Sequence, residues 1–96
     1  MATNRFEQVD EVQHDAITLC LMKQQDRPFG KVVFPASASG GRIPVDRISA
    51  DLPAVEAFRS AIRLANETRV PIVVMDPAGV WRAEWGELYR DIEPEP

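Results

Sequence analysis

Cysteine is nearly absent from this 96-residue chain, and its scarcity excludes two kinds of stabilised architecture. Cys20 is the only cysteine, so one chain can form neither an intrachain disulfide nor a zinc site built on cysteines. Cys20 lies among aliphatic residues, where a free cysteine usually acts as a small buried hydrophobic side chain. His14, the one histidine, lies in a polar segment, so we do not pair it with Cys20 as nucleophile and base. A reducing compartment is the simplest setting for this chain.

The sequence also lacks an excess of positive charge and any long apolar run. Its net charge is −4 with a pI near 4.9, so it offers no electrostatic footprint for a phosphate backbone or an anionic membrane surface. It contains no run of eighteen apolar residues, and its first fifteen residues lack the apolar core of a signal peptide. We expect a soluble cytoplasmic protein that binds neither nucleic acid nor membrane.

Groupings of residues that carry catalysis are missing as well. Many acidic residues lie near the two ends of the sequence, and no carboxylate pair falls in an apolar setting that would separate an acid from a base. The small-residue stretch 37–42 has two glycines and one arginine, but no lysine at the spacing of a phosphate-binding loop. We therefore expect a non-enzymatic protein without a cofactor or a metal.

The composition and length of the chain predict one folded domain with polar ends. An apolar fraction of 45% with charges of mixed sign is ordinary for a globular chain, and 96 residues suffice for a single core. Residues 1–15 are polar and acidic, and we expect a flexible or partner-dependent segment there. Residues 93–96 should form a disordered tail, so the predicted domain spans residues 16–92.

The first half of this domain predicts a β-hairpin and a long loop. Two sets of apolar or small side chains alternate over residues 17–22, which is typical of a strand with both faces at least partly covered. A second short strand is expected over 31–34, after a polar reversal. The following loop, 35–48, is rich in serine and glycine and has room for a short strand over 43–45.

An amphipathic helix is predicted over residues 51–68. Ser49 and Asp51 can accept hydrogen bonds from its first free amides, and Pro53 falls in the first turn, where its missing N–H costs little. Spacings of three and four place one apolar face toward a core. The main residues of this face are Val55, Phe58, Ile62 and Ala65.

A buried strand, a turn and an aromatic segment follow the helix. Residues 70–75 form a near-continuous apolar run, typical of a strand covered on both faces, and residues 76–79 suit a type I turn. The next residues allow two interpretations. We favour a return strand as far as Trp85, with a short helix beginning at Gly86; the alternative is one helix over residues 80–92.

These elements predict an α+β fold. A small sheet, made of the hairpin, the buried strand and the return strand, is backed by one main amphipathic helix and followed by a short C-terminal helix.

The aromatic segment supplies the candidate binding site. Two tryptophans and a tyrosine occur within nine residues, and both tryptophans point the same way under either interpretation. Their surface either belongs to the core or stays partly exposed as an anchor for a partner, since tryptophan, tyrosine and arginine dominate binding hot spots. The candidate interface residues are Trp81, Arg82, Trp85 and Tyr89.

The stretch ISADLPAVEAFRSAIRLANETRVPIVVMDPAGVWRAEWGELYRDI, residues 48–92, resembles half of a CBS domain pair. The resemblance lies in the order of leading strand, helix, apolar strand with proline, turn with aspartate, strand and short helix. It implies a nucleotide sensor that forms when two copies dimerise. The family places Thr or Ser three residues before Asp after its final strand, and residues 84–88 contain neither a hydroxyl side chain nor Asp. Our leading hypothesis is a protein-interaction or regulatory module that binds a partner or a second copy; the alternative is this CBS-like ligand sensor.

Overall fold

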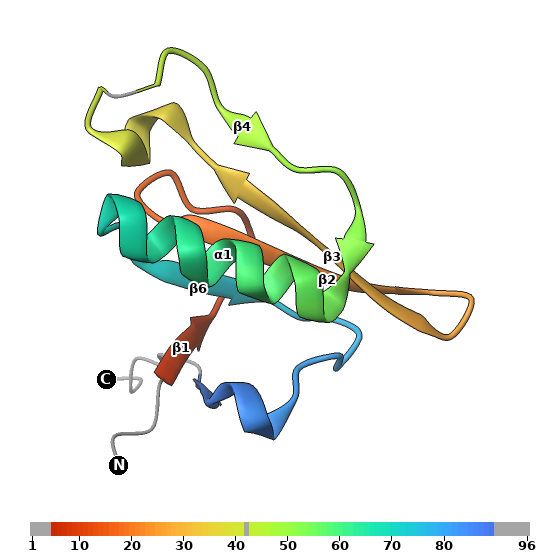
Figure 1. The fold of residues 1–96 in the computed structure, drawn as a ribbon. Helices are drawn as coiled ribbons and strands as arrows, with labels where there is room; N and C mark the ends of the chain where they lie inside the picture. The colour runs from red at the N-terminus through yellow and green to blue at the C-terminus, as the bar shows by residue number, and fades with distance from the viewer. Residues whose placement is uncertain (1–4, 42, 90–96) are drawn as a thin grey trace, which may run out of the picture.

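The computed structural model describes residues 5–41 and 43–89, which form one mixed sheet with a single long helix on one face (Figure 1). The strands are β1 (Arg5–Gln8), β2 (Ile17–Gln24), β3 (Arg27–Phe34), β4 (Arg47–Ile48), β5 (Leu52–Pro53), β6 (Ile72–Met75) and β7 (Glu87–Tyr89). The helical elements are α1 (Ala54–Thr68) and the 3₁₀ turns η1 (Ala36–Ser39) and η2 (Ala83–Trp85). The described strands follow the order β4-β3-β2-β6-β1-β7, and β5 also pairs with β3. The predicted α+β class is confirmed.

β2 and β3 form the predicted antiparallel hairpin, and both strands are longer than expected. Their pairing continues as far as Gln24 opposite Arg27. Between them, Gln25 and Asp26 have φ values of 49° and 64°, which are typical of a type I′ turn. Neither residue is glycine, so the sequence lacks the usual signature of such a turn, and the prediction ended β2 too early and began β3 too late.

β1 lies inside the sheet, between β6 and β7 and parallel to both. Its Phe6 is 8% exposed and belongs to the hydrophobic core. The predicted domain boundary at residue 16 is therefore wrong for residues 5–8. A four-residue strand with one large core-facing side chain looks polar in the sequence, and its two partner strands lie more than sixty residues away. Residues 1–4 and the predicted tail, 93–96, lie outside the described residues.

The connection from β1 to β2, residues 9–16, crosses β6 on the sheet face opposite α1. β6 separates β1 from β2 in the sheet, so the connection has to pass over it. The backbone N–H of Gln13 donates to Thr18 Oγ1 at 3.2 Å, and the Ser37 hydroxyl donates to the backbone carbonyl of His14. Thr18 alternates with Ile17 and Leu19, which face the core cluster, so its side chain lies on the other face. We call residues 9–16 the covering segment.

α1 begins at Ala54, later than predicted, and it has no side-chain cap. Its N-cap position is Pro53, and neither Ser49 nor Asp51 caps the first amides. The Ser49 hydroxyl instead accepts the backbone N–H of Val32 at 2.9 Å, which ties the chain before α1 to β3. The capping prediction was wrong because the chain stays extended through β5.

α1 packs on the sheet through small side chains. Ala54, Ala57 and Ala61 are its buried residues, while Phe58 and Ile62 are half-buried beside them. A Cβ atom at Gly30 of β3 would lie 2.9 Å from the Cβ of Ala57, so the glycine is what allows this close approach. Among the described residues, no helix combines the length and apolar character needed to cross a membrane.

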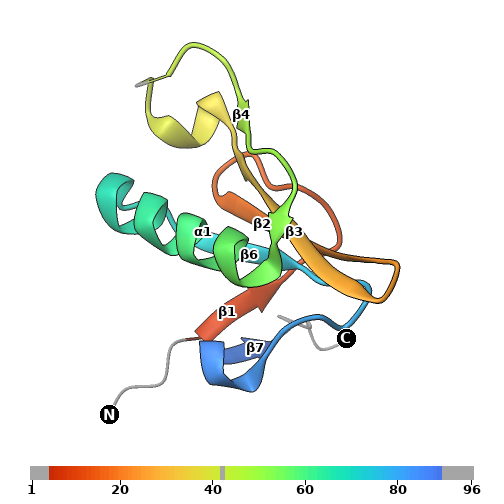
Figure 2. The ribbon, with the colours of Figure 1, turned by 45° about the vertical axis from the view of Figure 1, so that its right-hand side comes forward.

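The segment after β6 differs most from the prediction. The turn at 76–79 is present, with Gly79 at φ 70°. The return strand is absent: residues 83–85 form the turn η2, and the chain then enters β7, which runs parallel to β1 (Figure 2). β7 also occupies the start of the predicted C-terminal helix, and residues 90–92 of that helix lie outside the described residues. The short strand expected at 43–45 is likewise found later, as β4.

Asp76 explains why no antiparallel strand follows the turn. Its carboxylate is buried and accepts the backbone N–H of Val80 at 2.7 Å and that of Trp81 at 2.9 Å. These two donors are therefore unavailable for a ladder with β6. The chain is directed instead across the end of the sheet, toward the edge beyond β1.

Candidate interaction site

Both tryptophans of the predicted interface lie in an aromatic cluster with Phe6 and Phe58. Trp85 stacks on Phe58 with ring centroids 4.7 Å apart, and Trp81 meets Trp85 edge to face at 5.2 Å. The indole N–H of Trp81 donates to the carbonyl of Gly86 at 3.1 Å. Trp85 is 9% exposed, and Trp81 is half-buried. The cluster joins β1, α1 and the segment after β6, so these rings contribute to the core.

Arg82 and Tyr89, the other two predicted interface residues, do not share one surface. Arg82 is exposed, with its guanidinium 5.9 Å from the centre of the Trp85 ring. Tyr89 pairs with Glu7 and alternates with Leu88, which packs on the core cluster, so Tyr89 lies on the sheet face opposite α1. There the guanidinium of Arg5 lies 4.5 Å from the centre of the Tyr89 ring. The four residues are therefore divided between two sides of the sheet.

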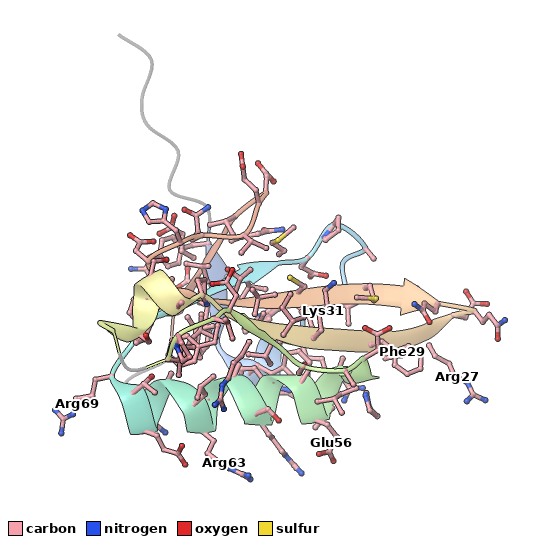
Figure 3. All side chains as sticks on the ribbon, turned by 90° about the horizontal axis from the view of Figure 1, so that it is seen from above. Arg27, Phe29, Lys31, Glu56, Arg63 and Arg69 are labelled. Atoms are coloured by element: carbon pink, nitrogen blue, oxygen red, sulfur yellow. The ribbon has the colours of Figure 1, made fainter. Side chains whose placement is uncertain are left out.

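A different group of side chains is gathered on the face opposite α1. Strand alternation and register place Cys20, Met22, Lys31 and Met75 among the residues there. Cys20 lies directly opposite Lys31 on β3 and Met75 on β6. We call these four residues the open sheet face. Figure 3 shows Lys31 on the side of the sheet away from α1, whereas Glu56 and Arg63 extend from α1 on the other side.

The covering segment extends over only part of this face. Thr18, Val33 and Val73 form one row across β3, β2 and β6, and all three are buried. Met22, Lys31 and Met75, nearer the hairpin turn, are only half-buried. The sheet thus has three parts that differ in what covers them: the face under α1, the row under the covering segment, and the open sheet face.

The open sheet face combines soft apolar groups with one positive charge. Cys20 Sγ lies 3.8 Å from Met75 Sδ. Burial raises the pKa of the Cys20 thiol, and the nearby Lys31 ammonium lowers it by a smaller amount, so the thiol stays protonated at neutral pH. Within the described part of the chain, Lys31 has no acidic side chain within ion-pair distance.

Within residues 5–41 and 43–89, Cys20 and His14 are not paired with each other. His14 lies in the covering segment, and the sulfur contact of Cys20 is with Met75 rather than with a base. No group of three His, Cys, Asp or Glu residues in this described part could hold a metal ion. Within the predicted loop 35–48, residues 36–39 form η1, and Ser39 of this turn borders a groove between α1 and β3.

The sequence carried a weak indication of the open sheet face. The alternation over 17–22 shows two sets of apolar or small side chains in β2, and we expected both faces to be partly covered. It does not show that the second set divides into a covered residue, Thr18, and an uncovered one, Met22. That division depends on where the covering segment crosses, which is a property of the strand order.

No family model, no curated protein and no solved structure matches this chain. The CBS-like order of elements holds only in part. A leading strand, the helix, the apolar strand and the aspartate turn are present, but the antiparallel strand implied after the turn is replaced by η2. The short helix implied next is replaced by β7 over residues 87–89.

Proposed function

We propose that this chain is a protein-interaction or regulatory module, and that a partner protein binds on its open sheet face. The observation that carries the proposal is the incomplete covering of the sheet: Met22, Lys31 and Met75 are left half-buried beside the buried row. A sheet normally packs each apolar face against a further layer. In this account, the partner supplies the missing layer over the hairpin end of the face.

The composition of the face favours a protein partner. Methionine side chains are unbranched and polarisable, and they adapt to differently shaped apolar surfaces, which is why they recur at binding surfaces. Met22 and Met75 lie on β2 and β6, neighbouring strands of one sheet. They would therefore contact the same partner surface, with Cys20 between them as a small buried residue.

The charge of the face favours a partner other than a second copy. Lys31 is the one cation in the group, and it lies opposite Cys20 near the middle of the face. A two-fold contact centred there would bring two ammonium groups together, because a symmetric dimer presents the same patch from both copies. A carboxylate on a different protein would pair with Lys31 instead, so we expect an apolar partner surface that includes an acidic residue.

The chemistry of Cys20 supports binding rather than catalysis. A catalytic cysteine needs a lowered thiol pKa, whereas burial acts in the opposite direction here. A free, protonated cysteine is also consistent with a reducing compartment such as the cytoplasm. We therefore propose a non-enzymatic cytoplasmic role.

Site-specific photo-crosslinking tests this proposal. A benzophenone amino acid is placed at position 22 or 75 in the full chain, with position 63 on the outer side of α1 as the control, and the protein is irradiated in extract of its source cells. We expect one protein to be crosslinked from positions 22 and 75 but not from 63. The crosslinked peptide should contain apolar residues and at least one carboxylate.

A charge-reversal pair makes the result specific. Lys31→Glu should abolish the crosslink, whereas Lys23→Glu, at an exposed position farther along β2, should leave it intact. Crosslinking to a second copy of the chain would show a homodimer interface and contradict the proposed partner. Equal crosslinking from positions 22 and 63, or none from 22 and 75, would also reject the proposal.

A further inference from the structure

An apolar groove lies between the second half of α1 and strands β3 and β4. Its volume is about 380 Å³, which falls within the range of small-molecule sites. Val32 and Phe34 of β3 form its floor, and Leu64 of α1 and Ile43 border it. Since Val32 and Phe34 belong to the core cluster under α1, this groove lies on the opposite side of the sheet from Met22 and Lys31.

The polar groups in the wall are already satisfied within the protein. Ser39 Oγ donates to the carbonyl of Ala36 at 2.7 Å, and Ser49 Oγ donates to that of Ala50 at 3.0 Å. The Thr68 hydroxyl donates to the carbonyl of Leu64 at 2.7 Å. These hydroxyl protons are therefore not directed into the groove, and the body of a ligand would meet a mainly apolar wall.

Arg47 is the one charged side chain among the described residues that line the groove. It pairs with Phe34, so strand register places its side chain on the α1 side of the sheet, at the margin of the apolar floor. It is exposed, and among the described residues it forms no ion pair. Neighbouring Asp46 is engaged elsewhere, since its carboxylate accepts the backbone N–H of Ala36 at 2.7 Å.

From this arrangement we infer that the groove binds a small amphipathic carboxylate, with its apolar body on Val32, Phe34 and Leu64 and its carboxylate on Arg47. A guanidinium matches a carboxylate through two parallel hydrogen bonds, and a pair at the margin of a groove keeps the charged ends partly hydrated. The apolar body would displace water from the floor. This site is separate from the open sheet face, so it can be tested without the partner protein.

Decanoate and decanol, below their aggregation concentrations, provide a matched pair of probes. Binding is followed by the methyl resonances of Val32, Ile43 and Leu64 in the full chain. We expect decanoate to shift these signals and to bind about tenfold or more tightly than decanol, as a charge-assisted hydrogen bond would give. Arg47→Gln should reduce decanoate binding to the level of decanol without changing decanol binding.

Arg63→Gln is the matched control, because this arginine extends from the outer side of α1. It should leave both affinities unchanged. A second variant, Leu64→Gln, should weaken both probes, since it places an amide in the apolar wall; its fold is checked by the unchanged signals of Met22 and Met75. Equal binding of the two probes, decanoate binding that survives Arg47→Gln, or no shift at these methyl groups at millimolar decanoate would overturn the inference.

Discussion

The indole ring of Trp85 lies parallel to the phenyl ring of Phe58, with 4.7 Å between the ring centroids and 8° between the planes. Phe58 is in the first half of α1, and Trp85 ends the turn η2, so this stack attaches the C-terminal segment to the helix. Phe6 of β1 meets Phe58 edge to face at 5.9 Å, which adds the third element. The aromatic residues that suggested a binding site therefore act mainly to close the core between α1 and the β1 end of the sheet.

This arrangement predicts a large stability loss for Trp85→Ala. The substitution removes the stacked ring and leaves a cavity against Phe58 and Trp81, so the free energy of unfolding should fall by about 3–5 kcal/mol. Urea denaturation followed by circular dichroism measures it. Arg82→Ala, which removes an exposed side chain over the same ring, should change stability by about 0.5 kcal/mol or less. Similar small effects for both variants would show that Trp85 is not a core residue.

The approach of α1 to β3 predicts that Gly30→Ala is destabilising. The added methyl group would meet Ala57 Cβ at 2.9 Å and Leu21 Cδ2 at 3.0 Å, and overpacking of this kind costs about 1–3 kcal/mol. Ala57→Gly opens space at the same contact, at a cost of about 1 kcal/mol for glycine within a helix. The double variant should therefore be more stable than the sum of the two single losses predicts, by at least about 0.5 kcal/mol. If the stability losses of the two single variants simply add up in the double variant, as measured by chemical denaturation, the contact is contradicted.

Asp76 should stabilise the turn after β6 through its two backbone hydrogen bonds. Asp76→Ala leaves the amides of Val80 and Trp81 without their acceptor and should lower the free energy of unfolding by about 2–3 kcal/mol. Asp76→Asn keeps one carbonyl oxygen as an acceptor and should lose less stability than Asp76→Ala. Asp51→Ala is the informative comparison, because Asp51 makes no cap on α1 and should tolerate the change within about 0.5 kcal/mol. A larger loss at Asp51 than at Asp76 would reverse this assignment.

The raised thiol pKa of Cys20 predicts that the stability of the protein depends on pH in the alkaline range. Because burial raises the pKa of its thiol in the folded protein, the folded state favours the protonated form. This contribution is complete below the pKa of the unfolded thiol and is lost as pH rises from there through the folded pKa. The stability of the wild type relative to Cys20→Ala should therefore decrease as pH rises into the alkaline range. A difference that stays constant with pH, measured by urea denaturation, would contradict a raised pKa.

The elements with strong local patterns were predictable from the sequence. The alternation in β2, the spacing of apolar residues in α1 and the apolar run of β6 each appear within a short stretch. The end of α1 at Thr68 was also predicted, since Pro71 favours an extended chain before it. The turn after β6 was visible from Asp76, Pro77 and Gly79.

The elements that depend on distant partners were not predictable. β1 is a strand because it pairs with β6 and β7, whereas its own four residues show little apolar pattern. β7 was mistaken for the start of a helix for the same reason. The candidate site was the hardest part to predict. Trp81 and Trp85 were chosen because they are typical hot-spot residue types, and they pack together. The open sheet face arises instead from strand order and from the path of the covering segment.

The solvent accessibility of Met22 and Met75 shows whether the open sheet face is free in the isolated protein. The chain has three methionines, so a sample with ¹³C-labelled methionine methyl groups gives a simple spectrum in which Met22 and Met75 can be assigned by substitution. A soluble gadolinium chelate should broaden both signals in the isolated protein, to the same extent at low and high protein concentration, and addition of the crosslinked partner should protect them. If both signals are already protected in the isolated protein, or become protected as its own concentration rises, the face is closed by the chain itself or by a second copy, and the proposed partner site is contradicted.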